Sequence, residues 1–311
     1  MPSTDRMDSL ATSTTGARGF IVIAALWILA ALSGLVLIYL SYVVNTAVVV
    51  TGGADRIQTE ALAQAGVELA VLQLSGRSEG ARPTSGTFNA RVGGGRVFVT
   101  FRSEAARIDL NAAPKFLLAG LMVSLGAGAD NAAVYADRII AWRAPTELGE
   151  NDPENSFYRT SGSPYPPRHA PFPAIEELWL VRGIPPAIVE RMMPHITVFS
   201  NVTEINVLDA APQVLASLPN VTPAKLQTIL SQRTDPALDP KSLIGMAGRE
   251  GATVVGSRAY RIKVDAELPN GRRSAAEIVV LLIEEGDEPF RILSWRDASD
   301  GSATLHEVAA R

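Results

Sequence analysis

The sequence predicts an α+β protein with three parts: an N-terminal transmembrane helix, an antiparallel sheet packed on that helix, and an all-helical domain inserted between strands of the sheet. Three observations predict this class. From Phe20 to Val50 the chain carries no charged residue. Strand-like alternation of apolar and polar residues occurs twice, before residue 103 and after residue 258. The long stretch between these two places has the pattern of short helices joined by proline-containing loops.

Length and composition limit the possible functions. With 311 residues, the chain is long enough for about two domains beyond the membrane helix. Its net charge of −4 argues against a dedicated polyanion binder. The absence of cysteine excludes disulfides, thiolate metal ligands and a cysteine nucleophile. His169, His195 and His306 lack the spacing of metal ligands, and no Ser, His and Asp set is evident, so we expect no enzyme.

The uncharged run is long enough to cross a lipid bilayer. A helix needs roughly 20 mostly apolar residues to span about 30 Å of hydrocarbon, and this run exceeds that length. An ordinary secretory signal has an apolar core of about 7 to 15 residues, so the run is too long for one. Arg18 on its N-terminal side favours a cytoplasmic leader and an exported body. We therefore expect a single-pass membrane protein.

The helix is expected to continue beyond the membrane, so that residues 20–75 form one transmembrane and spine helix. After Gly52 and Gly53, apolar residues recur at steps of three or four. They define the apolar face of an amphipathic segment: Ile57, Ala61, Ala65, Leu69 and Leu72. A short stalk helix is the alternative interpretation.

A polar leader, residues 1–19, ends in Arg18 and Gly19 directly before Phe20. This order resembles a type IV prepilin cleavage site. The resemblance implies that a prepilin peptidase cuts between Gly19 and Phe20 on the cytoplasmic side and methylates the new N-terminus. The helix would then be retained rather than removed. A plain single-pass anchor is the alternative.

Ala24 occupies the fifth position after the expected cleavage, where pilin-like chains usually carry Glu. A carboxylate inside a bilayer is costly unless it is paired. In pilin-like families this Glu is understood to neutralise the free amine of a neighbouring subunit. A subunit without it has no earlier amine to neutralise, so Ala24 suits the first subunit of a filament.

Five strands are predicted on the two sides of the helical stretch. Two of them belong to residues 76–106 and three to residues 251–311. The predicted strands are 88–92, 96–102, 258–267, 272–284 and 290–295. Three glycines separate the first two strands, and Asn270 and Gly271 give a strong turn signal between the third and fourth. All five are expected to form one antiparallel sheet.

Residues 107–250 are predicted to form the inserted helical domain, and they contain an internal echo. The segment from Ile108 to Pro114, IDLNAAP, is echoed from Ile205 to Pro212, INVLDAAP. In both copies an Asn or Asp can cap a helix start by accepting backbone N–H bonds, and proline is tolerated in the first turn. We therefore expect the two copies to open equivalent helices.

Between the two copies the sequence predicts a helical hairpin with a first helix from Glu176, a turn at Gly183 and a second helix from Pro186 to Met193. This unit resembles a helix-hairpin-helix or SAM-like domain, a fold used for both DNA and protein contacts. The DNA-binding version presents backbone N–H groups to phosphate, but Pro185 has none. From Arg107 to Arg249 the domain also carries 12 basic against 14 acidic residues. No nucleic acid is therefore expected as a partner.

The segment that joins the two halves of the helical domain carries a more specific resemblance. Trp142 and Arg143 lead into an acidic loop, which is followed by the runs SPYPPRHAPF (residues 163–172) and EELWLVRG (residues 176–183). This succession resembles the type II secretion system protein K (GspK) family of minor pseudopilins. The resemblance implies a non-enzymatic filament subunit of the bacterial inner membrane, with its body in the periplasm. It also implies four partners besides the bilayer: minor pseudopilins I and J at the pseudopilus tip, the prepilin peptidase and the inner-membrane secretion platform.

The same resemblance raises the possibility of calcium, which some family members bind in the helical domain. Calcium takes six to eight oxygen ligands from carboxylates and carbonyls. The carboxylates near the corresponding place are Asp137, Glu147, Glu150, Asp152 and Glu154. The acidic run that follows Trp-Arg in the family is replaced here by residues 144–146, so a solvated acidic loop is the alternative. No other cofactor is expected.

Two other functions stay open from the sequence. One is a membrane-anchored periplasmic protein-binding module with a SAM-like domain, with neither processing nor a filament. The other is a competence-type DNA receptor that would use the hairpin. Pro185 and the acidic balance of the helical domain disfavour the receptor.

Overall fold

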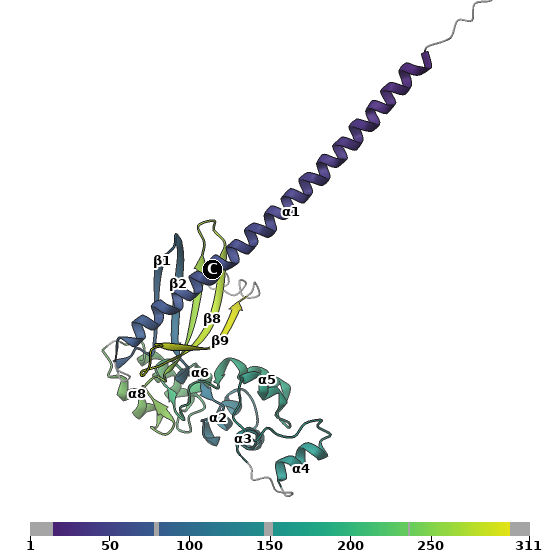
Figure 1. Cartoon of the computed structure of the whole chain (residues 1–311). Helices are drawn as coiled ribbons and strands as arrows, with labels where there is room; N and C mark the ends of the chain where they lie inside the picture. Colours follow the sequence, from purple (N-terminus) through teal and green to yellow (C-terminus); the bar gives the residue numbers. More distant parts are fainter. Residues whose placement is uncertain (1–14, 78–80, 146–151, 236, 299–311) are drawn as a thin grey trace, which may run out of the picture. The chain divides into compact units, whose positions relative to one another are not determined.

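The computed structural model describes residues 15–77, 81–145, 152–235 and 237–298. The chain divides into two units, Met1–Gln58 and Thr59–Arg311, which are treated separately. Helix α1, Thr15–Ser75, contributes residues to both units (Figure 1). Its backbone stays helical through Gly52 and Gly53. The predicted continuation of the membrane helix into a spine is therefore confirmed.

The first unit contains the apolar part of α1. From Ile23 to Leu40 the helix has a mean hydropathy of 2.5. Its large side chains are exposed, Trp27 at 74% among them. A helix that is apolar all round needs a nonpolar environment such as a bilayer. Among the described residues this is the one helix long and apolar enough to cross a membrane.

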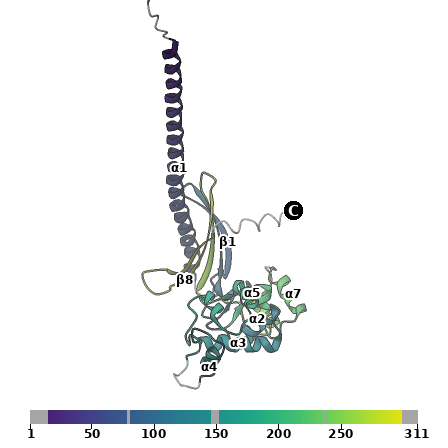
Figure 2. The ribbon, with the colours of Figure 1, turned by 90° about the vertical axis from the view of Figure 1, so that its right-hand side faces the viewer.

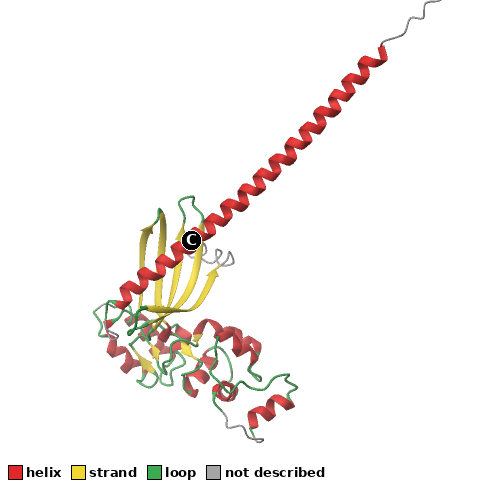
Figure 3. Ribbon diagram, viewed as in Figure 1, coloured by secondary structure: helices red, strands yellow, loops and turns green. Residues whose placement is uncertain are grey.

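The second unit contains a five-stranded antiparallel sheet of spatial order β1-β2-β7-β8-β9 (Figure 3). The strands are β1 Ser85–Val92, β2 Gly95–Ser103, β7 Ala259–Glu267, β8 Arg273–Leu282 and β9 Phe290–Ala298. Gly94 (φ 84°) and Gly271 (φ 80°) lie in the two hairpin turns with left-handed backbone, which favours glycine. The five predicted strands and their single antiparallel sheet are confirmed.

The C-terminal part of α1 packs on one face of this sheet. Its buried residues are Leu62, Ala63, Val67, Ala70, Val71 and Leu74. They share one apolar core with inward-facing side chains of the strands, including Val99, Ile262 and Ile278.

The buried face of α1 is not the one that the sequence predicts. Ile57 and Leu72, at the two ends of the expected apolar face, are 71% and 72% exposed. The face that is buried instead contains Gly66, where an added Cβ would lie 2.8 Å from Val264 Cγ1. Small residues let the helix backbone approach the strands and fill the interface densely. The buried face therefore combines larger apolar side chains, such as Leu62 and Leu74, with a glycine that allows the close approach to the sheet.

A helical insertion, residues 104–253, lies in the chain between β2 and β7 (Figure 2). Its α-helices are α2 Lys115–Ser124, α3 Ala129–Arg143, α4 Pro153–Thr160, α5 Pro186–Met192, α6 Pro212–Leu215, α7 Pro223–Gln232 and α8 Pro240–Ala247. Its 3₁₀ helices are η2 Glu104–Ala106, η3 Ile175–Leu180 and η4 Met193–His195. Helices α4 to α8 all begin with proline, whose fixed φ suits the first helical position. The insertion has an apolar core of its own, built around residues such as Leu117, Leu121 and Leu178.

Two pairs of very short parallel strands divide the insertion into two halves. Strand β3 Ile108–Asp109 pairs with β4 Ile196–Thr197, and β5 Ile205–Asn206 pairs with β6 Ala252–Thr253. The first strand of each pair opens one copy of the sequence echo. Each copy then leads into a helix, α2 or α6. The echo therefore corresponds to a repeated local structure, as predicted.

The predicted helix caps are wrong. Pro114 and Ala211 occupy the N-cap positions of α2 and α6, and neither makes a side-chain cap hydrogen bond. Asp109 and Asn206 instead accept from the backbone N–H two residues further on, at 2.7 and 2.8 Å. Such local hydrogen bonds are typical of Asx turns. These side chains therefore stabilise the turn that precedes each helix.

The predicted helical hairpin is present, but its first member is a 3₁₀ helix. Helix η3 has only six residues, and 3₁₀ geometry is common in such short pieces. Gly183 makes the turn with φ 88°, and α5 begins at Pro186. The SAM-like assignment of the whole insertion stays a prediction.

Candidate functional site

The sheet meets the helical insertion at the end where α1 terminates. Arg82, which follows α1, donates from Nε to the carbonyl of Leu74 in the last turn of the helix (3.0 Å). Ser103, at the end of β2, donates its N–H to the carbonyl of Thr84 (2.7 Å). The insertion starts at the next residue, Glu104. The end of α1 and the start of the insertion therefore lie together at one end of the sheet (Figure 2).

A buried charge cluster connects the sheet to the insertion, and we call it the junction: Glu104, Thr197, Arg261 and Glu277. Glu104 is 1% exposed. Arg261 on β7 donates to its two carboxylate oxygens, from Nε at 2.7 Å and from Nη2 at 3.0 Å. Thr197 on β4 donates its hydroxyl to the same carboxylate, and Arg261 also donates to Glu277 on β8. Strands β7 and β4 are thus tied directly to one buried carboxylate, and β8 is connected to it through Arg261.

The opposite charges of the junction stabilise the ionised forms of Arg261 and Glu277. Burial acts to lower the pKa of Arg261, but its hydrogen bond to Glu104 raises the pKa above the ordinary value. Burial acts to raise the pKa of Glu277, but the positive charge of Arg261 outweighs it and lowers the pKa. Both groups are therefore charged at neutral pH. The arrangement suits a rigid connection between the sheet and the first half of the insertion.

Sequence reasoning did not find the junction. Arg261 lies on the polar face of a predicted strand, where a charged residue is ordinarily solvated. Glu104 directly follows a strand, in the place of an ordinary loop residue. Their partnership joins residues 157 positions apart, and no local pattern indicates it.

The predicted processing residues lie near the start of α1. Gly19 and Phe20 are helical in their backbone. Ala24 lies at the beginning of the apolar span Ile23–Leu40, which contains no acidic residue. Cleavage between Gly19 and Phe20 stays a prediction.

The carboxylates suggested for calcium are not brought together among the described residues. Glu147 and Glu150 lie outside the part of the chain that the structure describes. Asp137 forms an exposed ion pair with Lys115 (2.7 Å). Asp152 instead lies at the start of α4, where it accepts from the N–H of Glu154 (2.9 Å).

The two carboxylates that are neighbours already have nitrogen atoms of other side chains as partners. Asp152 Oδ2 lies 2.9 Å from His169 Nε2, and Glu154 Oε2 lies 2.6 Å from Arg138 Nη1. Burial raises the pKa of Glu154 although Arg138 opposes the shift. Its second oxygen, Oε1, is buried with no hydrogen-bond partner in the described structure.

One unpartnered oxygen is too few for calcium, which takes six to eight. Within the described residues, no three His, Asp or Glu side chains form a group that could hold a metal. These residues therefore do not fit a calcium ion by themselves. A site would have to be completed by Glu147 and Glu150, and calcium binding stays a prediction.

Aromatic residues of the sequence motifs form a packed cluster. Trp142 stacks on Phe172 with ring centroids 6.2 Å apart, and its ring also contacts Tyr158 and Tyr165. Burial raises the pKa of Tyr158 to about 12, and its hydroxyl accepts from the N–H of Arg182 (2.9 Å). The Trp-Arg and Pro-Tyr motifs therefore position the loop before the hairpin by packing.

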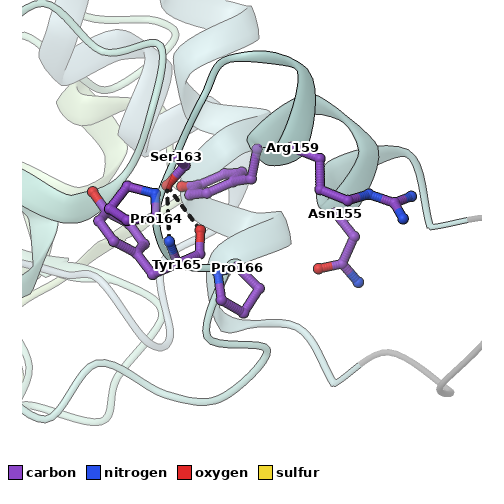
Figure 4. Close-up of a pocket in the computed structure, with 7 residues that line it drawn as sticks. Asn155, Arg159, Ser163, Pro164, Tyr165 and Pro166 are labelled. Carbon is purple, nitrogen blue, oxygen red and sulfur yellow. Dashed lines mark hydrogen bonds between the residues drawn. The ribbon is translucent and has the colours of Figure 1, made fainter.

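A pocket of about 370 Å³ lies beside this cluster (Figure 4). It is lined by Asn155, Tyr158, Arg159, Ser163, Pro164, Tyr165 and Pro166. Ser163 holds the turn by accepting from the N–H of Tyr165 and donating to its carbonyl, at 3.4 and 2.8 Å. The lining combines one cation with neutral side chains, and the arrangement indicates no acid and base pair for catalysis.

Comparison with known proteins gives two findings. Residues 102–201 match the model of a family described as type II secretion system (T2SS), protein K. A chain in the crystal structure of the GspK-GspI-GspJ complex from the enterotoxigenic Escherichia coli type 2 secretion system has a similar fold, with a TM-score of 0.52 and 17% sequence identity. The similarity covers 77% of this chain and 94% of that chain. Among curated proteins, no match was found.

Proposed function

From the match of residues 102–201 to the type II secretion system protein K family and the similar fold of a chain in the GspK-GspI-GspJ complex, we propose that this chain is a minor pseudopilin of that family. We propose that it caps the tip of a pseudopilus with minor pseudopilins I and J. The role is structural, as expected of a secretion component. By occupying the tip, the chain helps to initiate assembly of the pseudopilus for protein export.

The observation that carries this proposal is the position of the helical insertion. It begins at the end of the sheet where α1 terminates, as the contacts of Arg82 and Ser103 indicate. In pilin-like filaments, subunits stack along their N-terminal helices, and the subunit above lies over that end. An insertion of residues 104–253 occupies the same space. A position with no subunit above it accommodates the insertion, and the tip is that position.

The N-terminal helix supports the same proposal. The span Ile23–Leu40 fits a single-pass inner-membrane protein. Because Ala24 stands where pilin-like chains usually carry Glu, the span lacks the carboxylate that would neutralise the free amine of an earlier subunit. We propose that prepilin peptidase cuts after Gly19, that the body lies in the periplasm, and that the inner-membrane platform inserts the mature helix into the filament.

Stoichiometry tests the tip position. The full chain would be expressed with prepilin peptidase and with minor pseudopilins I and J of the same secretion system, and complexes would be purified from the inner membrane in detergent. Native mass spectrometry is expected to give one copy of each subunit. Repeated copies of this chain along isolated pseudopili would overturn the proposal. So would a correctly inserted and processed chain that forms no complex with I and J.

A further inference from the structure

The sheet face that points away from α1 is basic. We call the outward-facing residues of β1, β2 and β7 the outer face. Its solvent-accessible charged residues comprise four cations and two anions: Arg91, Arg96, Arg102 and Lys263 against Asp265 and Glu267. Arg261 belongs to the same face of β7 but is buried in the junction and paired with Glu104 and Glu277. The chain as a whole has a net charge of −4. The excess of positive charge is therefore local to this surface.

Two of these cations are placed at a cost to stability. Arg91 on β1 and Arg96 on β2 are directly opposite each other in the antiparallel register. Like charges in that arrangement destabilise a strand pair. Arg96 is 62% exposed at its side chain and is partly compensated by Glu267, 3.0 Å away. Within the described residues, neither Arg91 nor Arg102 has a carboxylate at ion-pair distance.

An exposed aromatic side chain lies among these charges. Phe98 is 48% exposed. In the sheet register it lies between Asn89 on β1 and Asp265 on β7. Aromatic residues and arginine are enriched at the centres of protein interfaces, whereas a solvated strand face is ordinarily polar. The combination indicates a surface that is covered in function.

We propose that the outer face binds an acidic surface of another protein, with Phe98 at the centre of the contact and Arg91 and Arg102 pairing with its carboxylates. Charge complementarity selects an acidic occupant. The two carboxylates of the outer face, Asp265 and Glu267, indicate that the binding partner is a protein rather than a lipid bilayer or a nucleic acid. A uniformly anionic surface is repelled at these two positions, whereas a protein surface can present a cation or a hydrogen-bond donor there.

The contact is tested by photo-crosslinking in intact, secretion-competent cells. A photoreactive amino acid replaces Asn89, which is exposed beside Phe98 in the register. We expect one protein adduct, identified by mass spectrometry, whose cross-linked peptide lies in an acidic surface region. The double variant Arg91→Glu with Arg102→Glu should lower the adduct at least tenfold.

A matched double variant, Lys225→Glu with Lys241→Glu, changes the net charge equally at exposed positions on α7 and α8. It should leave the adduct unchanged. Arg91→Glu removes a like-charge pair, so the outer-face variant is expected to keep its fold. Phe98→Ala provides a second variant with no change in charge, and it should also reduce the adduct several-fold.

Three results would overturn the proposal. The first is that adducts form with phospholipid or nucleic acid alone. The second is that the Lys225→Glu with Lys241→Glu control loses as much adduct as the outer-face variant. The third is that the cross-linked protein surface has no excess of acidic residues. None of these readouts depends on a tip position in the filament, so the two proposals fail independently.

Discussion

Gly120 of α2 lies directly against the backbone of Ser217, which follows α6. A Cβ added at Gly120 would lie 2.2 Å from the carbonyl oxygen of Ser217 and 2.9 Å from its Cα. Ser217 is buried, and its hydroxyl donates to the carbonyl of Val214 (2.6 Å). The two repeated halves of the insertion therefore pack backbone against backbone at this point.

Gly120→Ala is expected to destabilise the insertion. The neighbouring atoms are backbone, which cannot rotate away as a side chain can. Overpacking of this kind costs about 1–3 kcal/mol, and more where nothing can move. Urea unfolding of the full chain in detergent, followed by tryptophan fluorescence, should show a lower midpoint.

Gly245→Ala is the matched control for that change. Gly245 lies within α8 and has no atom within 4 Å of an added Cβ. Alanine there should raise stability by about 0.5–1 kcal/mol, because glycine is a poor helix former. A Gly120→Ala protein as stable as the wild type would show that the two halves separate more easily than their packing implies.

Loss of Arg261 is expected to be the most severe change at the junction. Arg261→Met leaves the buried carboxylate of Glu104 without its cation, which costs about 3–5 kcal/mol. Glu104→Gln should cost less, because Arg261 keeps its ion pair with Glu277. The double variant should be more stable than the sum of the two losses predicts, because residue 104 is then uncharged and Glu277 keeps Lys263 at 3.4 Å. A double-mutant cycle from urea unfolding measures the difference.

Lys115→Met serves as the control for the junction. Lys115 pairs with Asp137 at 2.7 Å, and the two side chains are 48% and 59% exposed. Exposed ion pairs contribute about 0–1 kcal/mol, so a small effect is expected. Equal losses from Lys115→Met and Arg261→Met would contradict the importance given to the junction.

Stability should fall with acidification in a way that depends on Glu277. Arg261 lowers the folded-state pKa of Glu277 below its ordinary value of 4.5. The contribution of this pair is therefore complete above pH 4.5 and is lost as the pH falls through the lowered pKa. Glu277→Gln should weaken this dependence in urea midpoints measured from pH 6 downwards. The exposed Glu250→Gln should keep it, and a full acid response in Glu277→Gln would exclude this group as its source.

Gly19→Ala should abolish N-terminal processing. Intact-mass measurements of the protein produced with prepilin peptidase are expected to show loss of residues 1–19 and addition of a methyl group, and the variant should keep the full N-terminus. Gly34→Ala, within the span and with no atom near an added Cβ, should be processed normally. An uncut wild-type chain beside an active peptidase would favour the anchored binding module instead.

Ala24→Glu should reduce assembly with I and J. An unpaired charged side chain in a membrane helix is unfavourable, by about 2.5–3.5 kcal/mol at the centre and by less near the end of the span, where Ala24 lies. A tip subunit has no earlier amine to pair with it. We expect several-fold less ternary complex from the same amount of membrane protein. Ala24→Gln, of similar size and without charge, should assemble better than the Glu variant. Equal assembly of the two variants would remove Ala24 as a marker of the tip.

The hairpins and the spine helix were predictable because their signals are local. Paired glycines at a left-handed turn, alternation along a strand and an uncharged run each act over a few residues. The buried face of α1 was not predictable in this way. Apolar residues recur at helical spacing on both faces, and the close contact of Gly66 with Val264, which distinguishes the buried face, joins residues far apart in the sequence.

The features of the candidate site can also be divided into those that local sequence patterns predict and those that only the tertiary structure reveals. The sequence alone is enough for the membrane span, the strands of the sheet, the two equivalent helix starts of the echo and the resemblance to protein K. The junction of Glu104 and Arg261, the contact of Gly120 with Ser217 and the basic outer face arise only when distant segments meet. The reason is physical: burial, close approach and shared charge are properties of pairs in space, and local patterns along the chain do not record them.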